Sequence, residues 1–373
     1  MRSVLPRPGR AAACVAVVAA MAGPLSGCTG PAKAQKPDLG SGKIAVLLPD
    51  TASSTRWESD DRRYLTAAFK AEGLSAGDFT IDNAQGDPSN QQSQAEQAIT
   101  NGASVLLLVN LDSGSGAAIE ANAVRQGLKV IDYDRLTLRG SASYYVSFDN
   151  VRVGKLQGQG LVDCLAATTP SGRKPSIIQL DGSPEDNNSA EFKQGYDSVL
   201  DPLFASGAYV RAGEQSVPKW DIQQAATIFD QMLTRAGNTV DGVAAANDAL
   251  ANAAITVLDN RGLHGVPVTG QDATIAGLQN ILAGDQCMTV YKPVQQEAVA
   301  AARLALELRE GKQPTETTTP VSAGDHDVPS VLLTPIPVTR SNIKQTVIRD
   351  GFRTLDQICT GRYLAMCKAD GLT

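Results

Sequence analysis

The chain has 373 residues, a formal net charge of −6 and 42% apolar residues. That length and apolar content can supply two cores of ordinary domain size. The acidic balance argues against nucleic acid as a partner, because binding it depends on Lys and Arg side chains that neutralise phosphates.

The first 27 residues have the pattern of a secretory signal peptide. Three arginines precede an apolar run from Ala11 to Ala22, which is too short to cross a hydrocarbon core of about 30 Å. The end of this region, Leu25-Ser26-Gly27-Cys28, resembles the lipobox of bacterial lipoproteins, whose cysteine is lipidated and becomes the mature N-terminus. It predicts an extracytoplasmic protein anchored to the outer face of the cytoplasmic membrane by a lipid at Cys28. Ordinary secretion with an unmodified Cys28 is the alternative.

Removal of residues 1–27 would leave 30 basic and 39 acidic side chains, a formal charge of −9. Residues 28–42 are rich in Pro, Gly, Lys and Ala without an apolar period, which predicts a flexible tether. No later segment is long and apolar enough to span a bilayer.

From Lys43 onward, short apolar runs alternate with amphipathic stretches in two series. The predicted strands are 43–49, 79–84, 104–110, 129–133 and 144–148, followed by 176–180, 209–214, 242–246, 267–270 and 288–291. Between two of them, Ile222, Ala225, Phe229 and Met232 recur at the spacing of one helix face. Alternating strands and helices are typical of parallel sheets with helices on both faces. Two series predict two α/β domains.

Four cysteines remain for the mature fold: Cys164, Cys287, Cys359 and Cys367. An even number in an oxidising compartment fits two disulfides, for which three connectivities are possible. Closeness in sequence favours pairing the last two cysteines, which leaves the first two as the other pair. Zinc is the alternative, but no cysteine pair has the spacing of a zinc knuckle, and only two histidines exist, His264 and His326. We therefore predict no metal site.

Polar side chains follow the predicted strands, at the edge where open parallel sheets bind ligands. After the first series these are Asp50, Arg56, Trp57, Asn83, Gln85, Asn110, Asp132, Asp134 and Arg135. After the second series they are Asp181, Asp186, Asn187, Asn188, Trp220, Asn247, Asp248, Asp272 and Lys292. Carboxylates accept hydrogen bonds, Arg and Lys donate, and Asn does both, while indole rings pack on the C–H faces of a pyranose. This inventory indicates a small, uncharged, polyhydroxylated ligand.

At these residues the chain resembles the D-xylose-binding proteins of bacterial ABC transporters, a branch of the periplasmic binding proteins for pentoses and hexoses. The likeness runs in the family's order from about Lys43 to Phe352. Its segments are Thr55-Arg56-Trp57, Tyr133-Asp134-Arg135, Tyr145-Val146-Ser147-Phe148-Asp149-Asn150, Ser183-Pro184-Glu185-Asp186-Asn187-Asn188, Asn247-Asp248-Ala249, Gly270-Gln271-Asp272-Ala273, Met288-Thr289-Val290-Tyr291-Lys292-Pro293 and Asp327-Val328-Pro329-Ser330. The chain departs from the family pattern in its lipobox, its four cysteines and its extension past Phe352.

The resemblance implies an α/β, two-lobed fold in which each lobe is a parallel sheet with helices on both faces, and a three-strand hinge lets the lobes close on a sugar. It implies a first lobe of 43–148 plus 292–334 and a second lobe of 149–291 plus 335–373. The implied polar sugar ligands are Arg56, Arg135, Asp186, Asn188, Asn247, Asp272 and Lys292, and the implied stacking residues are Trp57 and Trp220.

The resemblance implies capture of an aldopentose, with D-xylose the first choice, and its delivery to an ABC permease by a monomer without a cofactor, and the lipobox predicts that this monomer is a lipoprotein. No Ser, Cys or His lies in a recognisable nucleophile motif, so no enzyme is predicted. A sugar sensor that presents glucose, arabinose or another aldose to a membrane receptor is the alternative. A sugar-responsive repressor would need a DNA-binding headpiece where the signal peptide stands.

Several candidates also admit simpler structural roles. Asp186, Asn187 and Asp248 stand at predicted helix starts, where capping alone favours them, and capping is our interpretation of Asp248. Arg135 could pair with a neighbouring aspartate, Asp132 or Asp134, at the end of its strand.

Two further candidates have a structural alternative that depends on their neighbours in the chain. Trp57, just ahead of a helix, could be a core anchor. Lys292, just before a proline, could be only a hinge residue.

Overall fold

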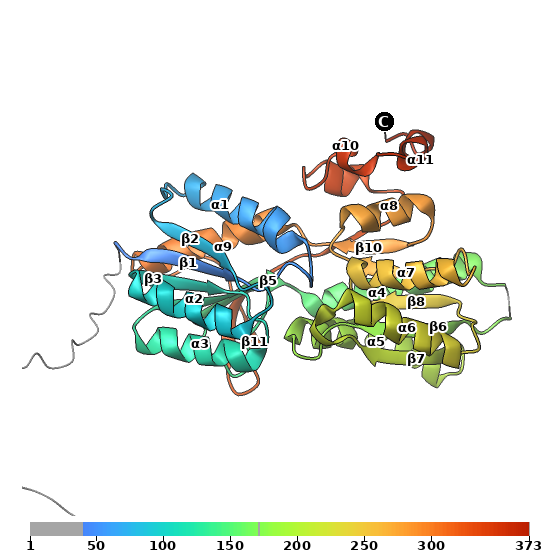
Figure 1. Ribbon diagram of the computed structural model, residues 1–373, viewed down its shortest axis with the longest axis horizontal. Coiled ribbons are helices and arrows are strands. Elements are labelled where there is room, and N and C mark those ends of the chain that lie inside the picture. The colour runs from blue at the N-terminus through green and yellow to red at the C-terminus, as the bar shows by residue number, and fades with distance from the viewer. Residues whose placement is uncertain (1–39, 171, 373) are drawn as a thin grey trace, which may run out of the picture. The chain divides into compact units, whose positions relative to one another are not determined.

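The computed structural model describes residues 40–170 and 172–372, which belong to one compact unit. The predicted signal peptide, Cys28 and most of the predicted tether lie outside the described residues. The described chain forms two groups of strands, each with helices packed on it (Figure 1). Among the described helices, none has the length and apolar character needed to cross a membrane.

The first group is a seven-stranded sheet in the order β11-β12-β5-β4-β3-β1-β2. Its strands are β1 (Lys43–Leu48), β2 (Phe79–Asn83), β3 (Ala103–Leu108), β4 (Lys129–Tyr133), β5 (Tyr144–Phe148), β11 (Thr319–Ser322) and β12 (Asp327–Leu333). All neighbours are parallel except β11, which pairs antiparallel with β12. The first five strands match the predicted series. The two late strands were not predicted.

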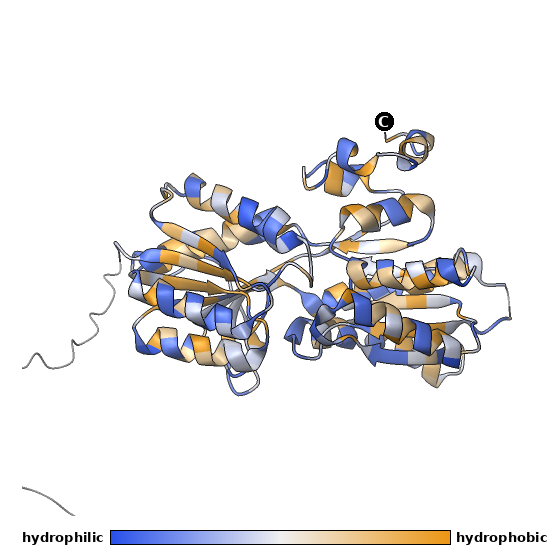
Figure 2. Cartoon of the chain, in the orientation of Figure 1, coloured by the Kyte–Doolittle hydropathy of each residue, from blue (hydrophilic) through white to orange (hydrophobic). Residues whose placement is uncertain are grey.

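Helices cover both faces of this sheet: η1 (Trp57–Asp61), α1 (Arg62–Ala71), α2 (Pro88–Thr100), α3 (Ser113–Arg125) and α9 (Val294–Arg309). Along β1, Ile44 and Val46 belong to the core that includes α1 and α9, whereas Ala45 and Leu47 belong to the core that includes α2 and α3. Successive side chains of a strand point to opposite faces, so a strand buried on both sides is apolar throughout. Figure 2 shows these central strands as apolar.

The second group contains two three-stranded sheets, ordered β7-β6-β8 and β13-β10-β9, and a bridge between Val243 and Val268 joins them. The strands are β6 (Ser176–Asp181), β7 (Val210–Ser216), β8 (Gly242–Ala245), β9 (Thr269–Gln271), β10 (Met288–Tyr291) and β13 (Ile336–Val338). The helices are α4 (Asn150–Thr168), α5 (Asn187–Ala205), η2 (Pro218–Trp220), α6 (Ile222–Arg235), α7 (Asp248–Asn260) and α8 (Ile275–Ala283). Helix α6 is the amphipathic helix that the sequence predicts.

The chain passes between the two groups three times: from β5 into α4, from β10 into α9, and from β12 into β13. After the third passage, η3 (Lys344–Ile348), α10 (Leu355–Ile358) and α11 (Tyr363–Ala369) form a C-terminal segment that packs beside α8 (Figure 1). Ile358 and Cys367 of this segment share a core with Leu278 and Ile281 of α8. The exact lobe boundaries stay a prediction.

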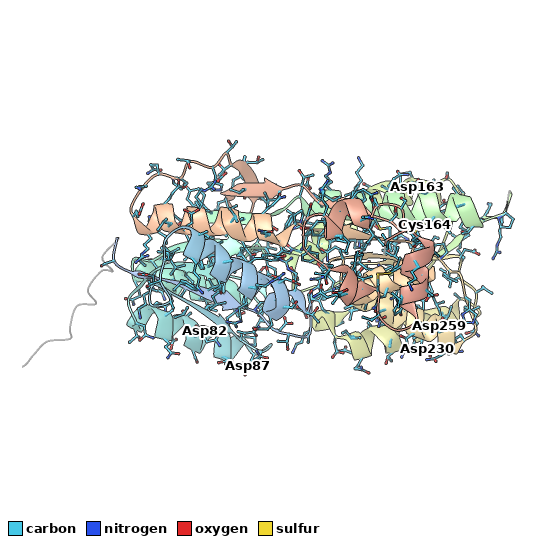
Figure 3. The ribbon with its side chains drawn as sticks, turned by 90° about the horizontal axis from the view of Figure 1, so that it is seen from above. Asp82, Asp87, Asp163, Cys164, Asp230 and Asp259 are labelled. Carbon is cyan, nitrogen blue, oxygen red and sulfur yellow. A yellow bond between two sulfur atoms is a disulfide. The ribbon has the colours of Figure 1, made fainter. Side chains whose placement is uncertain are left out.

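Two disulfides join Cys164 to Cys287 and Cys359 to Cys367. They confirm the pairing that closeness in sequence favours. The first ties α4, on which Figure 3 labels Cys164, to the residue before β10. The second links the residue after α10 to α11, and so closes a short loop in the C-terminal segment.

Candidate functional site

A narrow cavity of about 30 Å³, which has room for only one or two water molecules, lies between the loops of the two strand groups. All nine residues predicted to bind the sugar line it: Arg56, Trp57, Arg135, Asp186, Asn188, Trp220, Asn247, Asp272 and Lys292. Five further residues complete the lining: Ser53, Ser54, Asp134, Phe192 and Gln271.

The cavity has two walls, each built at the carboxyl ends of parallel strands. The first wall follows β1 and β4 and consists of Ser53, Ser54, Arg56, Trp57, Asp134 and Arg135. The second wall follows β6, β7, β8 and β9 and consists of Asp186, Asn188, Phe192, Trp220, Asn247, Gln271 and Asp272. Lys292 lies on the passage from β10 to α9.

Arg56 is the centre of a buried ion-pair network behind the first wall. Its guanidinium donates to both carboxylate oxygens of Asp61 at 2.8 Å, to Asp134 at 2.7 Å and to Glu297 of α9 at 2.8 Å. Burial alone would lower the pKa of Arg56, but Asp134, Asp61 and Glu297 outweigh it and raise that pKa above its usual value. Burial, with Asp134, raises the pKa of Glu297 and favours its neutral form.

Asp134 is the carboxylate that this network presents to the cavity. It accepts from Arg56, from Lys292 at 3.0 Å and from Asn188 of the second wall at 3.1 Å. Burial opposes ionisation, but Arg56 and Lys292 prevail and hold the pKa of Asp134 below its ordinary value. Its backbone is left-handed at φ 61°, and its carbonyl accepts from the hydroxyl of Ser147 at 2.8 Å. The side chain is therefore held in one orientation as an ionised acceptor.

Trp57 contributes a ring flanked by two cations. The guanidinium carbon of Arg56 lies 4.5 Å from the ring centroid and that of Arg135 lies 5.3 Å from it. The indole N–H donates to the Ser53 hydroxyl at 3.1 Å. Trp57 is also part of the apolar core of the first sheet, as its structural alternative predicts, while its role in sugar stacking stays a prediction.

Arg135 does not form the ion pair with Asp132 or Asp134 that the sequence suggests as an alternative. It forms an ion pair across the cavity with Asp186, with 2.9 Å between its Nε and a carboxylate oxygen, and it donates to the Ser53 hydroxyl at 3.1 Å. Asp132 instead accepts from the backbone N–H and the hydroxyl of Thr137. The partner of Arg135 is set by tertiary packing, because Asp186 belongs to the opposite wall of the cavity.

The second wall positions its polar groups by helix capping. Asp186 caps α5 by accepting from the Asn188 N–H at 3.0 Å, and it also accepts from the Trp220 indole at 3.1 Å. Asn247 caps α7 through the Leu250 N–H at 2.9 Å, and its amide donates to the Ser53 carbonyl at 3.3 Å. The first turn of each helix thus presents a side chain to the cavity.

The capping interpretation of Asp248 is wrong, because Asn247 is the cap. Asp248 accepts from the Thr274 N–H, the Gln286 amide and the Thr289 hydroxyl, each at 2.8 Å. Burial raises the pKa of Asp248 to about 6. Asp248 thus joins the start of α7 to the loops around α8 and β10 and does not line the cavity.

Two residues of the second wall depend on unusual backbone. Asp272 has φ 100° and accepts from the Ser54 hydroxyl across the cavity at 3.2 Å. Trp220 has φ 55°, and a Cβ added at Gly182 would lie 2.1 Å from its ring. Only glycine at position 182 leaves room for the indole.

Sequence reasoning did not assign Ser53, Ser54, Asp134, Phe192 or Gln271 as ligands. Asp134, Gln271 and the serines lie within or beside segments that carry the family resemblance, which is the signal that could have found them. The side-chain oxygen of Gln271 has no hydrogen-bond partner among the described residues. Within the same part of the chain, no cluster of acidic, His or Cys side chains could hold a metal ion.

Residues 44–313 match the family model described as periplasmic binding protein domain. The chain therefore belongs to the periplasmic binding protein family.

Its relatives include the D-xylose-binding periplasmic protein of Escherichia coli (strain K12), with 41% identity over 83% of this chain and 90% of that protein. The D-xylose-binding periplasmic protein of Haemophilus influenzae is 40% identical over 85% of this chain and 92% of its own length. A multiple sugar-binding periplasmic receptor of Rhizobium radiobacter is 34% identical over 85% and 92%. These relatives are periplasmic sugar-binding proteins and not enzymes, which confirms the prediction that this chain is no enzyme.

Solved structures of two transporter solute-binding proteins superimpose on this chain. One is a carbohydrate-transporter protein from Chloroflexus aurantiacus in complex with D-glucose, with TM-score 0.76, 27% identity and coverage of 84% of this chain and 97% of that one. The other, from Clostridium phytofermentans with bound β-D-glucose, has TM-score 0.76, 28% identity and coverage of 84% and 99%. The comparisons confirm the predicted fold class and the predicted class of protein, an extracytoplasmic substrate-binding protein of ABC transport.

Proposed function

We propose that this protein captures an aldopentose, D-xylose in the first place, and delivers it to an ABC permease as a monomer anchored by a lipid at Cys28. One observation carries the proposal: the nine residues implied by the resemblance to D-xylose-binding proteins line one cavity, although they come from loops spread between positions 56 and 292.

The proposed mechanism is closure of two lobes, 43–148 plus 292–334 and 149–291 plus 335–373, on the sugar. Residues of the two walls already contact each other across the cavity, through the ion pair of Arg135 with Asp186 and the hydrogen bond from Ser54 to Asp272. A sugar hydroxyl both donates and accepts, so it can bridge such a pair, with contacts to both walls only when the lobes are together. Binding then favours the closed arrangement through differential affinity.

A pentose is large enough for tight binding. It has ten non-hydrogen atoms, and the ceiling of about −1.5 kcal/mol per atom for the best small ligands leaves room for the roughly −8 kcal/mol of micromolar affinity. Trp57 and Trp220 would pack on its C–H faces while Asp134, Asp186 and Asp272 accept from its hydroxyls.

A tryptophan fluorescence titration tests the ligand directly, because the two tryptophans of the chain both line the cavity. A soluble form starting at Lys43 is titrated with D-xylose, glucose, arabinose, ribose and galactose. A saturable signal at micromolar D-xylose with little response to the others supports the proposal. No response to any pentose contradicts it.

A sugar sensor that presents glucose, arabinose or another aldose to a membrane receptor is the second candidate. It is favoured by the 34% identity to a protein described as a multiple sugar-binding receptor. A similar response to several aldoses, together with co-purification of a receptor in place of a permease, would support this candidate.

The lipid anchor has its own test. Cys28→Ser should move the full-length protein from the membrane fraction to the soluble fraction. Continued membrane association of the variant would contradict the anchor but leave the sugar-binding proposal intact.

A further inference from the structure

Arg353 joins the C-terminal segment to the first group of strands through a buried ion pair. Its two terminal nitrogens donate to the two carboxylate oxygens of Asp60 in η1, at 2.9 and 3.1 Å. The side chains of Arg353 and Asp60 are only 7% and 2% exposed. Parallel donation of this kind fixes the relative orientation of the two planar groups, and burial strengthens each contact.

The same guanidinium also contacts the second wall of the cavity. Its Nε donates to the carbonyl of Ala273 at 3.2 Å. Ala273 follows Asp272, and both residues have left-handed backbone, at φ 47° and 100°. Left-handed backbone at residues other than glycine costs conformational free energy, and it persists only where the surrounding structure holds it. Arg353 is one of the groups that hold it.

Both partners of Arg353 are adjacent to candidate sugar ligands. Asp60 precedes Asp61, which accepts two hydrogen bonds from Arg56. Ala273 continues the loop that carries Asp272. One buried cation thus connects the segment that positions Arg56 in the first wall with the segment that positions Asp272 in the second.

Other contacts already hold the C-terminal segment in place. Gln279 of α8 donates to the carbonyl of Ile358 at 3.0 Å, and the segment's apolar side chains, with the disulfide between Cys359 and Cys367, pack against α8. The nearest other cation to Asp60, Arg63, is 3.6 Å away with a side chain that is 56% exposed. Attachment of the segment therefore does not require Arg353, and Arg63 does not reproduce its geometry.

We propose that Arg353 is a positioning residue that clamps the two walls of the sugar site together and slows release of the bound sugar. A contact that joins the walls only in the closed arrangement contributes its free energy to that arrangement and not to the open one, and so stabilises closure. This inference rests on the proposed sugar-binding function for its kinetic part, and on the structure alone for its conformational part.

The kinetic test measures sugar dissociation by stopped-flow tryptophan fluorescence for Arg353→Gln, Asp60→Asn and the double variant. Each single variant should release the sugar about tenfold faster, because loss of one partner of a buried charge pair acts mainly on dissociation. The double variant should resemble the single ones, since the same contact is lost. Arg353→Lys keeps the charge but not the paired donation, and should recover only part of the residence time.

Arg349→Gln is the matched control, because Arg349 lies four residues earlier and pairs with Asp350 on the surface, with 66% of its side chain exposed. It should leave the dissociation rate within about twofold of wild type. A purely structural role for Arg353 predicts a lower melting temperature of the sugar-free protein with an unchanged dissociation rate, and that result would overturn the proposal. If Arg353→Gln does not fold, Asp60→Asn carries the test alone.

Small-angle X-ray scattering of the sugar-free protein separates this proposal from the sugar assignment. Arg353→Gln and Asp60→Asn should have a larger radius of gyration than wild type and Arg349→Gln, whichever ligand the protein binds. Equal radii together with unchanged dissociation rates would overturn the clamp. A wild-type protein that binds no sugar but shows this difference would contradict the proposed function alone.

Discussion

The two walls of the cavity hold their polar side chains by different means. In the first wall, Arg56 and Asp134 are fixed by a buried network of ion pairs that extends to α9 through Glu297. In the second wall, Asp186 and Asn247 are fixed at helix N-termini by capping bonds. Removing one partner of a buried ion pair lowers the stability of a protein more than removing a helix cap, which contributes about 1 kcal/mol. The first wall is therefore more sensitive to single substitutions.

Two buried aspartates, Asp134 and Asp248, also differ in how their carboxylates are stabilised. Asp134 has cations around it and a pKa below its ordinary value, whereas Asp248 has only neutral donors and burial raises its pKa to about 6. The cations around Asp134 outweigh the loss of hydration, whereas the neutral donors around Asp248 do not. The first wall thus presents fixed charge, and the region behind the second wall holds a titratable group.

The largest expected effect is that of Arg56→Met. It leaves Asp61, Asp134 and Glu297 without their shared cation and should lower the free energy of unfolding by about 3–5 kcal/mol. Urea unfolding measures this loss. Arg62→Met is the control, since its ion pair with Glu58 is about one-third exposed and should contribute less than about 1 kcal/mol. Similar losses in both variants would contradict the importance of the network.

The next effect is a pH dependence that belongs to Asp248. Its pKa is about 6 in the folded protein and 3.8 as the unfolded reference, so the folded state binds the proton more tightly. Its stabilising contribution is complete below pH 3.8 and is lost as the pH rises through 6, by about 3 kcal/mol in all. Urea unfolding of wild type and Asp248→Asn between pH 4 and 7 should therefore show a smaller fall in stability for the variant. Parallel curves would show that Asp248 is not the group that titrates.

Asp272→Ala tests a ligand on the second wall. The substitution removes the acceptor that faces Ser54 and should weaken sugar affinity at least about tenfold, since hydrogen bonds to charged groups contribute about 1.5–3 kcal/mol. The fluorescence titration measures it. Left-handed backbone is less favourable for Ala than for Asp, so urea unfolding of the variant measures the loss of stability separately. Unchanged affinity would remove Asp272 from the site.

Asn247→Ala should have the smallest effect on stability. Loss of the cap to the Leu250 N–H should cost about 1 kcal/mol in urea unfolding, with a modest loss of sugar affinity. Thr274→Ala, which removes the cap of α8 and a hydrogen bond to Asp248 outside the cavity lining, is the comparison variant. If Asn247→Ala weakens binding no more than Thr274→Ala does, Asn247 acts only as a cap.

The elements that could be predicted are those whose buried residues follow a regular pattern along the chain. Strands β1 and β3 are apolar along most of their length because helices cover both faces of their sheet, and α6 shows a clear apolar face. Strands β11, β12 and β13 were missed because they are only partly buried and contain prolines. The partners of β12 and β13, which are β5 and β10, lie nearby only in the folded chain.

The candidate ligands could be named because each follows a strand or lies in a segment that resembles the family. Their partners could not be named in the same way. The ion pair of Arg135 with Asp186 joins positions 51 residues apart, and the ion pair of Arg56 with Glu297 joins positions 241 residues apart. No local pattern records such a pairing.

The sequence by itself determined the alternation of strands and helices, the disulfide pairs that closeness favours and the residue types gathered at strand ends. These follow from periodicity and spacing, which are local properties of the chain. Only the tertiary structure decided which charges are compensated, that Asp134 joins the cavity, that Asn247 and not Asp248 is the cap, and that Arg353 reaches Asp60. Those outcomes depend on burial and on distances between remote segments, and burial determines how strongly two charges interact.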